Sequence, residues 1–238
     1  MKNIKPYNES ASKKIQIAKM FNNISTTYDK LNSYMSFGMH HIWRKKAIKE
    51  IKNNPKNILD VATGTADFAI SNTKFTNANV TGIDISEGML NIGREKIKKK
   101  NLTKRIKLKI ADCEKLPFKD KNFDAITVGF GVRNFENILK GLKEMHRVLA
   151  KNGSVVILEP NNPKTFPLKQ IYYMYFNYIV PFIGKIISKD KSAYKYLPNS
   201  VKEFNKTLLS DHLREVGFRE IKYIPLSFGI IGLYTAIK

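Results

Sequence analysis

Short apolar runs alternate with amphipathic stretches through the middle of this chain. The runs that predict strands are residues 57–62, 80–84, 106–111, 123–130 and 154–159. The stretches that predict helices lie between them, at residues 66–72, 87–99 and 137–149. Ser86 is a suitable N-cap for the second helix, and Lys151, Asn152 and Gly153 are expected to end the third. This alternation predicts an α/β fold with a doubly wound, mostly parallel sheet.

The segments at the two ends of the chain are predicted to cover this sheet. Residues 12–51 are expected to be helical, with one face traced by Ile15, Ala18, Lys19 and Asn22 and a second amphipathic stretch beginning at residue 41. A helix near residues 201–216, ended by Gly217, and strands around 219–224 and 230–237 are expected to complete the chain.

An aromatic-rich segment, residues 166–187, interrupts the regular order after the fifth strand. Four residues inside it are unsuited to a bilayer centre, namely Lys169, Asn177, Pro181 and Lys185. We therefore expect a buried helix or an apolar lid rather than a membrane span. At 238 residues the chain suits a single domain over 1–238, with residues 1–52 as a helical N-terminal cap and residues 160–200 as a hydrophobic insertion that covers the substrate.

Composition places the protein among globular chains, with 42% hydrophobic and 11% aromatic residues. Residues 1–19 are polar and rich in lysine, so no secretory signal is expected. Cys113 is the lone cysteine, which excludes a disulfide framework and a cysteine metal site. We expect a cytoplasmic protein, and contact with the inner face of the membrane stays open.

The formal net charge of +22 is the feature that favours a polyanionic partner. The lysines are nevertheless spread along the whole chain, with one dense cluster between residues 96 and 105. Abundant Asn and Ile alongside Lys indicate AT-rich coding rather than a selected binding face. We expect no specific nucleic-acid partner, although the charge is compatible with weak attraction to anionic lipids.

The first predicted strand runs into a turn of small residues, Ala62-Thr63-Gly64-Thr65-Ala66, and a helix follows. The next strand ends in Asp84, twenty residues after Gly64. A turn without bulky side chains lets the backbone approach a ligand, and an acid at the tip of the second strand can bind both hydroxyls of a ribose. This pairing predicts a nucleoside-containing cofactor, with an ordinary tight turn as the alternative.

The glycine pattern of this turn argues against a dinucleotide. A pyrophosphate needs several exposed backbone N–H groups at a helix N-terminus, and here Gly64 alone has the required register. Asp67 would also bring a negative charge to the place where the pyrophosphate belongs. S-adenosylmethionine carries a sulfonium and an ammonium but no phosphate, so it suits the turn better.

Several longer segments resemble one family over nearly the full length of the chain. They read MFNNISTTYDKLNSYMSFGMHHIWR, LDVATGTADF, GIDISEGML, ADCEKLPFKDKNFDAITVGFGVRNFEN, EMHRVLAKNGSVVILEP and YYMYFNYIVPFIGKIISKDKSAYKYLPNS, followed by GF and FGIIGLYTAIK. TYDKLN, FGVRNF and the block 181–197 are the most specific pieces. The chain resembles the C-methyltransferases of ubiquinone and menaquinone biosynthesis, the UbiE/MenG family. The resemblance implies a class I S-adenosylmethionine-dependent methyltransferase fold with a seven-stranded sheet.

Two positions depart from the family pattern. Ala66 stands where most members carry glycine, and it would cost about 1 kcal/mol if the position required a positive φ. Pro160 replaces a residue that is usually Phe or Thr, just past the fifth strand. Neither change removes a group that takes part in chemistry.

The resemblance also implies a set of cofactor-binding residues. Thr65 matches the family's threonine in the turn, and Asp84 matches the acid on the ribose. Asp112 and Cys113 follow the third strand, where members hold adenine through a carboxylate and a backbone N–H. Gly129 ends the fourth strand, where the chain passes the methionine moiety.

Arg133 and Asn134 follow the fourth strand, at the edge of the sheet where such folds place their substrates. A quinol carbon becomes more nucleophilic as a ring hydroxyl loses its proton, so a cation that stabilises the phenolate should help. We predict that Arg133 performs this role and that Asn134 orients the hydroxyl. The alternative is a structural ion pair between Arg133 and Glu136 or Glu159.

Several other residues have both a functional and a structural interpretation. Tyr28 and Asp29 are candidates to close over the cofactor, with a helix cap as the alternative for Asp29. The neighbouring His40 and His41 point apart on a helix, so a metal site is not expected. A channel for a quinone tail or ordinary core packing are the two interpretations of Met20, Met35, Met39 and Met174.

The predicted activity is C-methylation of demethylmenaquinol to menaquinol, because GTAD and VGFG are closer to the menaquinone branch of the family. A ubiquinone precursor, 2-polyprenyl-6-methoxy-1,4-benzoquinol, is the alternative acceptor. A nucleic-acid methyltransferase is less favoured, because base-modifying enzymes usually carry Asp/Asn-Pro-Pro-Tyr/Phe after the fourth strand. This chain has Gly129-Phe130-Gly131-Val132 there. A prenylated quinol is the expected partner, and a homodimer stays open.

Overall fold

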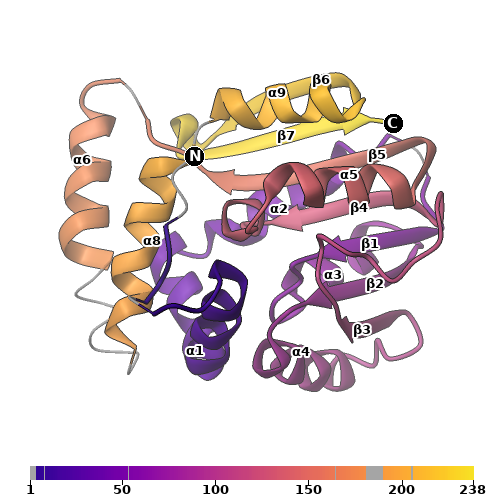
Figure 1. Ribbon diagram of the computed structural model, residues 1–238, viewed down its shortest axis with the longest axis horizontal. Helices are drawn as coiled ribbons and strands as arrows, with labels where there is room; N and C mark the ends of the chain where they lie inside the picture. The colour runs from indigo at the N-terminus through magenta and orange to yellow at the C-terminus, as the bar shows by residue number, and fades with distance from the viewer. Residues whose placement is uncertain (1–3, 8, 53, 164, 181–189, 205) are drawn as a thin grey trace.

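The computed structural model describes residues 4–7, 9–52, 54–163, 165–180, 190–204 and 206–238. The described residues form a seven-stranded sheet in the order β3-β2-β1-β4-β5-β7-β6 (Figure 1). The strands are β1 (Asn57–Val61), β2 (Asn79–Asp84), β3 (Ile106–Ile110), β4 (Phe123–Gly129), β5 (Leu149–Pro160), β6 (Arg219–Leu226) and β7 (Ile231–Ile237). Strands β1 to β5 pair in parallel, and β7 is antiparallel to both neighbours. The predicted doubly wound, mostly parallel sheet is confirmed.

Helices cover both faces of the sheet. They are α1 (Lys13–Ser36), α2 (Met39–Lys49), α3 (Asp67–Phe75), α4 (Glu87–Lys99), α5 (Ile138–Val148), α6 (Leu168–Met174), α8 (Lys191–Glu203) and α9 (Lys206–Val216). Short helical turns are η1 (Val132–Asn134), η2 (Tyr175–Ile179) and η3 (Ser227–Gly229). Apolar residues of α5 and α9 pack on one face, and those of α2, α3 and α4 pack on the other.

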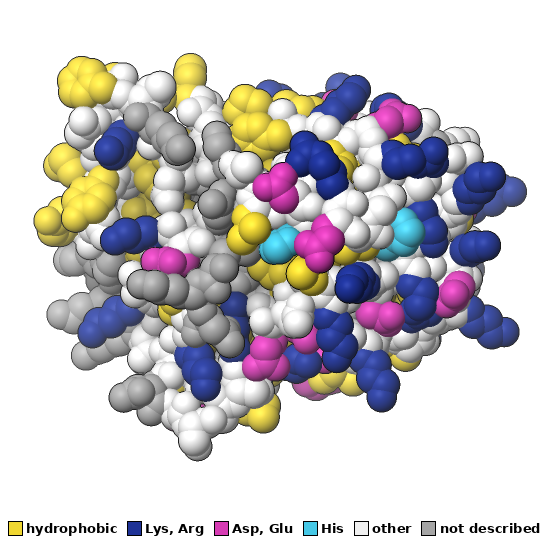
Figure 2. Space-filling view, turned by 45° about the horizontal axis from the view of Figure 1, so that its top comes forward, with side chains coloured by type: hydrophobic (Ala, Val, Ile, Leu, Met, Phe, Trp, Pro, Cys, Tyr) yellow, Lys and Arg dark blue, Asp and Glu magenta, His cyan; other side chains and the backbone are white. Residues whose placement is uncertain are grey.

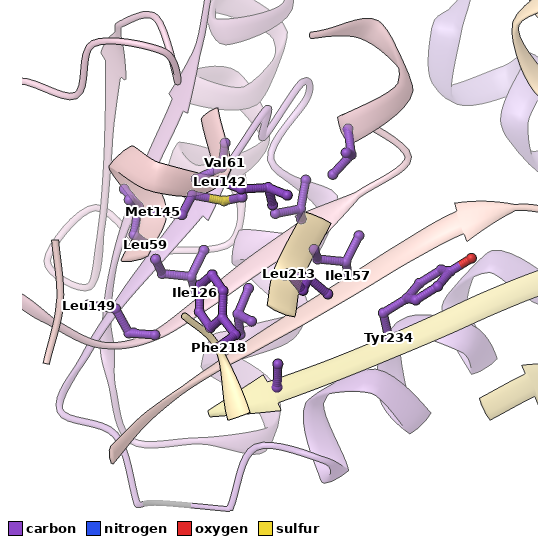
Figure 3. Packing of buried hydrophobic residues seen from close by; sticks show 14 of the residues in the cluster. Leu59, Val61, Ile126, Leu142, Met145, Leu149, Ile157, Leu213, Phe218 and Tyr234 are labelled. Carbon is purple, nitrogen blue, oxygen red and sulfur yellow. The ribbon is translucent and has the colours of Figure 1, made fainter. Parts of the chain in front are cut away.

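The largest core cluster lies between the sheet and the α5–α9 face (Figure 3). Leu142 and Met145 of α5 meet Leu59 and Ile126 of the central strands, and Leu213 of α9 completes the contact. All five side chains are fully buried. Burying a side chain of this size contributes about 1.5–3 kcal/mol, so this layer fixes the positions of β1 and β4.

Capping residues in the sequence predicted the start of α4 correctly and the end of α5 wrongly. Ser86 caps α4 as predicted, because its hydroxyl accepts from the backbone N–H of Met89. The prediction that residues 151–153 end α5 is wrong. The helix ends at Val148, and Leu149 already pairs with Phe123 in the sheet. Hydrogen bonding across strands therefore overrode the glycine signal at this end.

The N-terminal region holds two helices, separated by Phe37 and Gly38 in the left-handed conformation (φ 49° and 73°). The predicted inward face of the first is wrong, since Ile15 is exposed. The apolar residues of α1 that are buried are instead Ile17, Met20, Ile24 and Leu31. They pack against Met89 of α4 and Tyr196 of α8, neither of which is close in sequence.

The single helix predicted near residues 201–216 is likewise two helices, because Phe204 is extended.

The aromatic segment after β5 forms α6 and η2, which stand apart from the sheet beside α8 (Figure 1). The part of this segment and of the block 181–197 that falls on residues 181–189 lies outside the described residues. Among the residues that are described, no helix has the length and apolar character needed to cross a membrane.

Candidate active site

A cleft opens at the carboxyl ends of β1, β2, β3 and β4, beside the point where the strand order reverses. Five of the predicted site residues line it, namely Asp84, Asp112, Cys113, Gly129 and Asn134. The cleft is closed on the other side by α1, which contributes Lys14, Ile17, Phe21 and Tyr28. The fold thus brings the predicted residues of three strands together, under a helix from the N-terminal cap.

Asp84 is held rigidly at the end of β2. One carboxylate oxygen accepts from the backbone N–H of Gly64 at 2.9 Å, and the other accepts from Ser86 at 2.9 Å. Burial raises the pKa of Asp84, and these backbone donors oppose the shift. Each oxygen keeps a lone pair for a further donor, so the carboxylate suits two vicinal hydroxyls.

Asp112 lies on the opposite wall of the cleft. One of its oxygens accepts from the backbone N–H of Glu114 at 2.9 Å, and the other forms an ion pair with Lys14 at 2.5 Å. Burial raises the pKa of the neighbouring Cys113 well above its usual range, so the thiol stays protonated. Its side chain packs against the core cluster on the α5 side of the sheet. Sequence reasoning missed Lys14, because nothing in its surroundings distinguishes it from the many other lysines.

The end of β4 approaches its neighbours closely. A Cβ atom at Gly129 would lie 2.9 Å from Phe68, and one at Gly131 would lie 2.6 Å from Ala62. Both glycines line the cleft. A side chain at either position would have to displace Phe68 or Ala62, so the two glycines allow this close packing at the edge of the cleft.

Thr65 and Asp67 face away from the cleft, into a polar network. The Thr65 hydroxyl donates to Asp29 at 2.6 Å, and Lys96 binds Asp29 at 2.9 Å and also binds Asp67. Arg44 lies 3.3 Å from the other oxygen of Asp67. The interpretation that Asp67 offers its charge to a cationic ligand is wrong, because protein cations already neutralise it.

The helix-cap alternative for Asp29 is also wrong, since this residue lies in the interior of α1. Its contacts instead tie the N-terminal helix to the turn after β1. Ala66 in the same turn adopts the left-handed conformation (φ 64°), so the departure from glycine carries the expected strain.

A second, larger cavity of about 510 Å³ adjoins the cleft. It lies among α1, α2, η1, α6, α8 and the β6–β7 turn, and most of its lining is apolar. The two cavities share four lining residues, namely Phe21, Tyr28, Phe130 and Asn134. Met20, Met35 and Met39 line the larger cavity, whereas Met174 is largely exposed. The two cavities therefore lie next to each other, with these four side chains lining both.

Arg133 reaches the larger cavity from η1. Its Nη1 donates to Glu159 at 2.8 Å and also to the carbonyl of Phe130. The buried ion pair considered as the alternative role is thus present, with Glu159 as the partner. Burial opposes the charge of Arg133, but the Glu159 carboxylate outweighs it and raises the pKa of the guanidinium. Arg133 is a fixed cation at the edge of an apolar cavity.

Asn134 is held between the two cavities. Its side-chain oxygen accepts from the Tyr196 hydroxyl at 3.0 Å, and its amide approaches the carbonyl of Phe130 at 3.4 Å. His40 lines the larger cavity and contacts the hydroxyl of Ser36 at 2.5 Å. Burial, followed by the charge of Arg44, lowers the pKa of His40 to about 4, so its ring is neutral near pH 7.

The sheet order of the described residues and the cleft at its carboxyl edge define the class I S-adenosylmethionine-dependent methyltransferase fold. The structure is similar to an S-adenosylmethionine-dependent methyltransferase from Aquifex aeolicus, with a TM-score of 0.64 and 19% identity over 88% of this chain and 97% of that one. It is also similar to one from Thermotoga maritima, with a TM-score of 0.67 and 19% identity over 93% and 99% of the two chains.

The chain belongs to the ubiE/COQ5 methyltransferase family, whose model matches residues 9–238. It is 47% identical to the demethylmenaquinone methyltransferase of Bacteroides fragilis, over 99% of this chain and 97% of that protein. The demethylmenaquinone methyltransferase of Porphyromonas gingivalis is 43% identical, over 99% and 98%. The ubiquinone/menaquinone biosynthesis C-methyltransferase UbiE of Geotalea daltonii is 43% identical, over 94% and 96%. The family and the cofactor predicted from the sequence are confirmed.

Proposed function

We propose that the protein methylates a ring carbon of demethylmenaquinol to give menaquinol. S-adenosylmethionine supplies the methyl group, the ring carbon forms the new bond, and the hydrogen of that carbon leaves as a proton. The observation that carries the proposal is the apolar cavity of about 510 Å³, which meets the cofactor cleft at Phe21, Tyr28, Phe130 and Asn134. A bulky apolar acceptor fits such a cavity, and its reactive ring would lie next to the cleft.

The cofactor cleft fits an adenosyl group. The two oxygens of Asp84 retain lone pairs for the ribose hydroxyls. The Asp112 carboxylate would likewise accept a hydrogen bond from the adenine amine, once its ion pair with Lys14 loosens. Gly129 and Gly131 leave the end of β4 bare where the methionine portion would pass. Thr65 faces Asp29 instead, so we propose that it holds α1 against the turn.

On the acceptor side, Arg133 would stabilise the phenolate that makes the ring carbon nucleophilic. Its charge is fixed by Glu159, so the guanidinium needs no rearrangement as negative charge develops on the ring oxygen. Asn134, oriented by the Tyr196 hydroxyl, would position the ring between the cavities. The apolar walls exclude water and so favour transfer to carbon.

Labelled methyl transfer tests this function directly. The protein is incubated with methyl-labelled S-adenosylmethionine and, in separate reactions, demethylmenaquinol, 2-polyprenyl-6-methoxy-1,4-benzoquinol, RNA and DNA. We expect label in menaquinol above all. Preferred labelling of the benzoquinol would move the substrate to the ubiquinone branch, and stoichiometric label in RNA or DNA would overturn the quinol assignment.

We also propose that the mouth of the larger cavity docks on an anionic lipid bilayer. Phe37, Ile171 and Phe228, here called the rim, line the cavity and are nevertheless 82%, 59% and 84% exposed. Phe37 and Phe228 both have left-handed backbones (φ 49° and 56°), a strained conformation that is concentrated at functional positions. Exposed phenylalanines at the mouth of an apolar cavity are suited to insertion among acyl chains.

The surroundings of the rim support the same partner. Figure 2 shows apolar side chains gathered at the end of the molecule where α6 lies, while Lys and Arg are scattered over the visible face. Met174 on α6 and Tyr178 on η2 are also exposed. The net charge of +22 favours an anionic surface, and a prenylated acceptor would enter the cavity from such a membrane.

A further inference from the structure

Several residues that line the larger cavity carry a buried polar atom without a hydrogen-bond partner. Among the described residues, five buried side-chain atoms lack a hydrogen-bond partner. Three of them belong to residues that line this cavity, namely Arg44 Nη1, Arg133 Nε and the Tyr172 hydroxyl. Arg44 Nη1 still lies 3.3 Å from the Asp67 carboxylate. Buried polar groups are normally satisfied, so the other two require an explanation.

Tyr172 differs from the other tyrosines of this cavity. The hydroxyl of Tyr196 donates to Asn134 at 3.0 Å, and that of Tyr175 donates to the carbonyl of Met35 at 3.0 Å. Tyr28 has a hydrogen bond with the side chain of Asn32. The Tyr172 hydroxyl alone among the four has no protein partner in the described part of the chain.

The position of Tyr172 on α6 is well defined by its neighbours. Tyr172 is 9% exposed, whereas the adjacent Ile171 and Tyr173 are 59% and 62% exposed. Its ring packs on Phe176, with centroids 4.4 Å apart. The helix therefore turns this one side chain inward, toward the cavity that it lines.

Burial and the positive charge of Arg133 both affect the pKa of the Tyr172 hydroxyl. Burial raises the pKa of the Tyr172 hydroxyl, and the positive charge of Arg133 acts in the opposite direction. The hydroxyl stays protonated and can donate. Nε of Arg133 is also a donor. Among the described residues that line the cavity, these two donors are therefore unpaired, and no lining residue is a carboxylate that could accept from them.

We propose that the Tyr172 hydroxyl and Arg133 Nε together bind one oxygen of the acceptor ring, the oxygen next to the carbon that is methylated. This inference rests on the proposed function. A phenolate oxygen presents three lone pairs and a negative charge, so it satisfies both donors better than a neutral hydroxyl does. The pair therefore binds the ring more tightly as the oxygen loses its proton, which is when the adjacent carbon becomes nucleophilic. Tyr172 keeps its own proton throughout.

The substitution Tyr172→Phe removes the hydroxyl and keeps the ring, and Tyr173→Phe is the matched control on the exposed side of α6. We expect Tyr172→Phe to lower kcat for demethylmenaquinol by about tenfold or more, with the affinity for S-adenosylhomocysteine unchanged. Its melting temperature should be equal or higher, because an unsatisfied buried hydroxyl is lost. Tyr173→Phe should match the unmodified protein in each measurement. A kcat for Tyr172→Phe within twofold of the unmodified protein would overturn the oxygen site.

A second measurement separates this inference from the proposed reaction. 1-Naphthol is an aromatic phenol without a prenyl tail, and its binding in the presence of S-adenosylhomocysteine is followed by its fluorescence. We expect Tyr172→Phe to weaken naphthol binding about tenfold and Tyr173→Phe to leave it unchanged. This result would hold even if demethylmenaquinol were not the substrate. Equal affinity of all three proteins for naphthol would refute the oxygen site, whereas a failed transfer assay with the expected naphthol result would refute only the substrate.

Discussion

The guanidinium of Arg133 and the carboxylate of Glu159 form a buried ion pair of 2.8 Å at the edge of the apolar cavity. Glu159 lies near the end of β5, and Arg133 lies in the turn after β4, so adjacent parallel strands set their distance. The pair serves two purposes at once. It neutralises two buried charges, and it leaves Nε of Arg133 without a hydrogen-bond partner among the described residues.

We predict that Arg133→Ala lowers kcat by ~10²–10³ while affinity for S-adenosylhomocysteine changes little. The same change leaves Glu159 buried without its partner, so the free energy of unfolding should fall by about 3–5 kcal/mol. Glu159→Gln is the control, because it removes the ion pair and retains the guanidinium. Rates are measured per folded molecule together with the melting temperature. A kcat of Arg133→Ala near that of the unmodified protein, with a lower melting temperature, would mean that Arg133 is scaffold.

Asp84 is the residue on which cofactor binding should depend most. Asp84→Asn keeps the size of the side chain but replaces one acceptor oxygen with a donor and removes the charge. We expect affinity for S-adenosylhomocysteine to fall about 10- to 100-fold, since hydrogen bonds to a charged group contribute about 1.5–3 kcal/mol. Calorimetric titration measures this, with Asp211→Asn on the exposed surface of α9 as the control. An affinity within threefold of the unmodified protein would contradict the ribose assignment.

The buried His40 should make stability depend on pH. Its pKa is lowered to about 4 in the folded protein, below the usual value of 6.5, so the unfolded chain binds a proton first as the pH falls. Above pH 6.5 the neutral His40 makes its full contribution to the free energy of unfolding. This contribution falls by up to about 3 kcal/mol as the pH drops from about 6.5 to 4. Asp60 has the opposite sign, because burial raises its pKa to about 6 and the folded state gains stability as it takes up the proton.

A difference measurement isolates His40 from Asp60. Urea unfolding at pH 7 and at pH 4.5 is compared for the unmodified protein, His40→Gln and His212→Gln, a control on α9. The loss of stability on acidification should be smaller in His40→Gln than in the other two. Parallel behaviour of all three proteins would show that His40 is not the group that titrates.

Substituting the phenylalanines of the rim tests whether the protein docks on a membrane through this surface. Phe228→Ser combined with Phe37→Ser should reduce binding to vesicles of phosphatidylglycerol and phosphatidylcholine by about tenfold or more, because each exposed ring would otherwise bury its area among lipids. Phe75→Ser is the control, an exposed ring on α3 that lies outside the rim. Sedimentation with vesicles measures the binding. An unchanged bound fraction in the double variant would refute docking through the rim.

Much of the fold follows from local sequence. The apolar runs located the strands to within a residue or two at most ends, because the central parallel strands β1 and β4 are buried on both faces and are therefore mostly apolar. Ser86 defined the start of α4 through its own cap. Asp84 and Gly129 were placed in the cofactor cleft because parallel strands bring their carboxyl ends to one edge.

Contacts between distant segments decided the rest. Asp67 has a sequence position suited to a cationic ligand, yet Arg44 from α2 and Lys96 from α4 neutralise it. The inward face of α1 differs from the one its apolar spacing suggested, because α4 and α8 supply the surface on which it packs. Tyr172 is one of several tyrosines on an aromatic stretch, and nothing in the sequence distinguishes it.

The sequence by itself determined the order of strands and helices and the family chemistry, which depend on local periodicity and on residues at strand ends. The tertiary structure decided which charges are neutralised and which polar groups remain free for a ligand, because both depend on helices that meet only after the chain has folded.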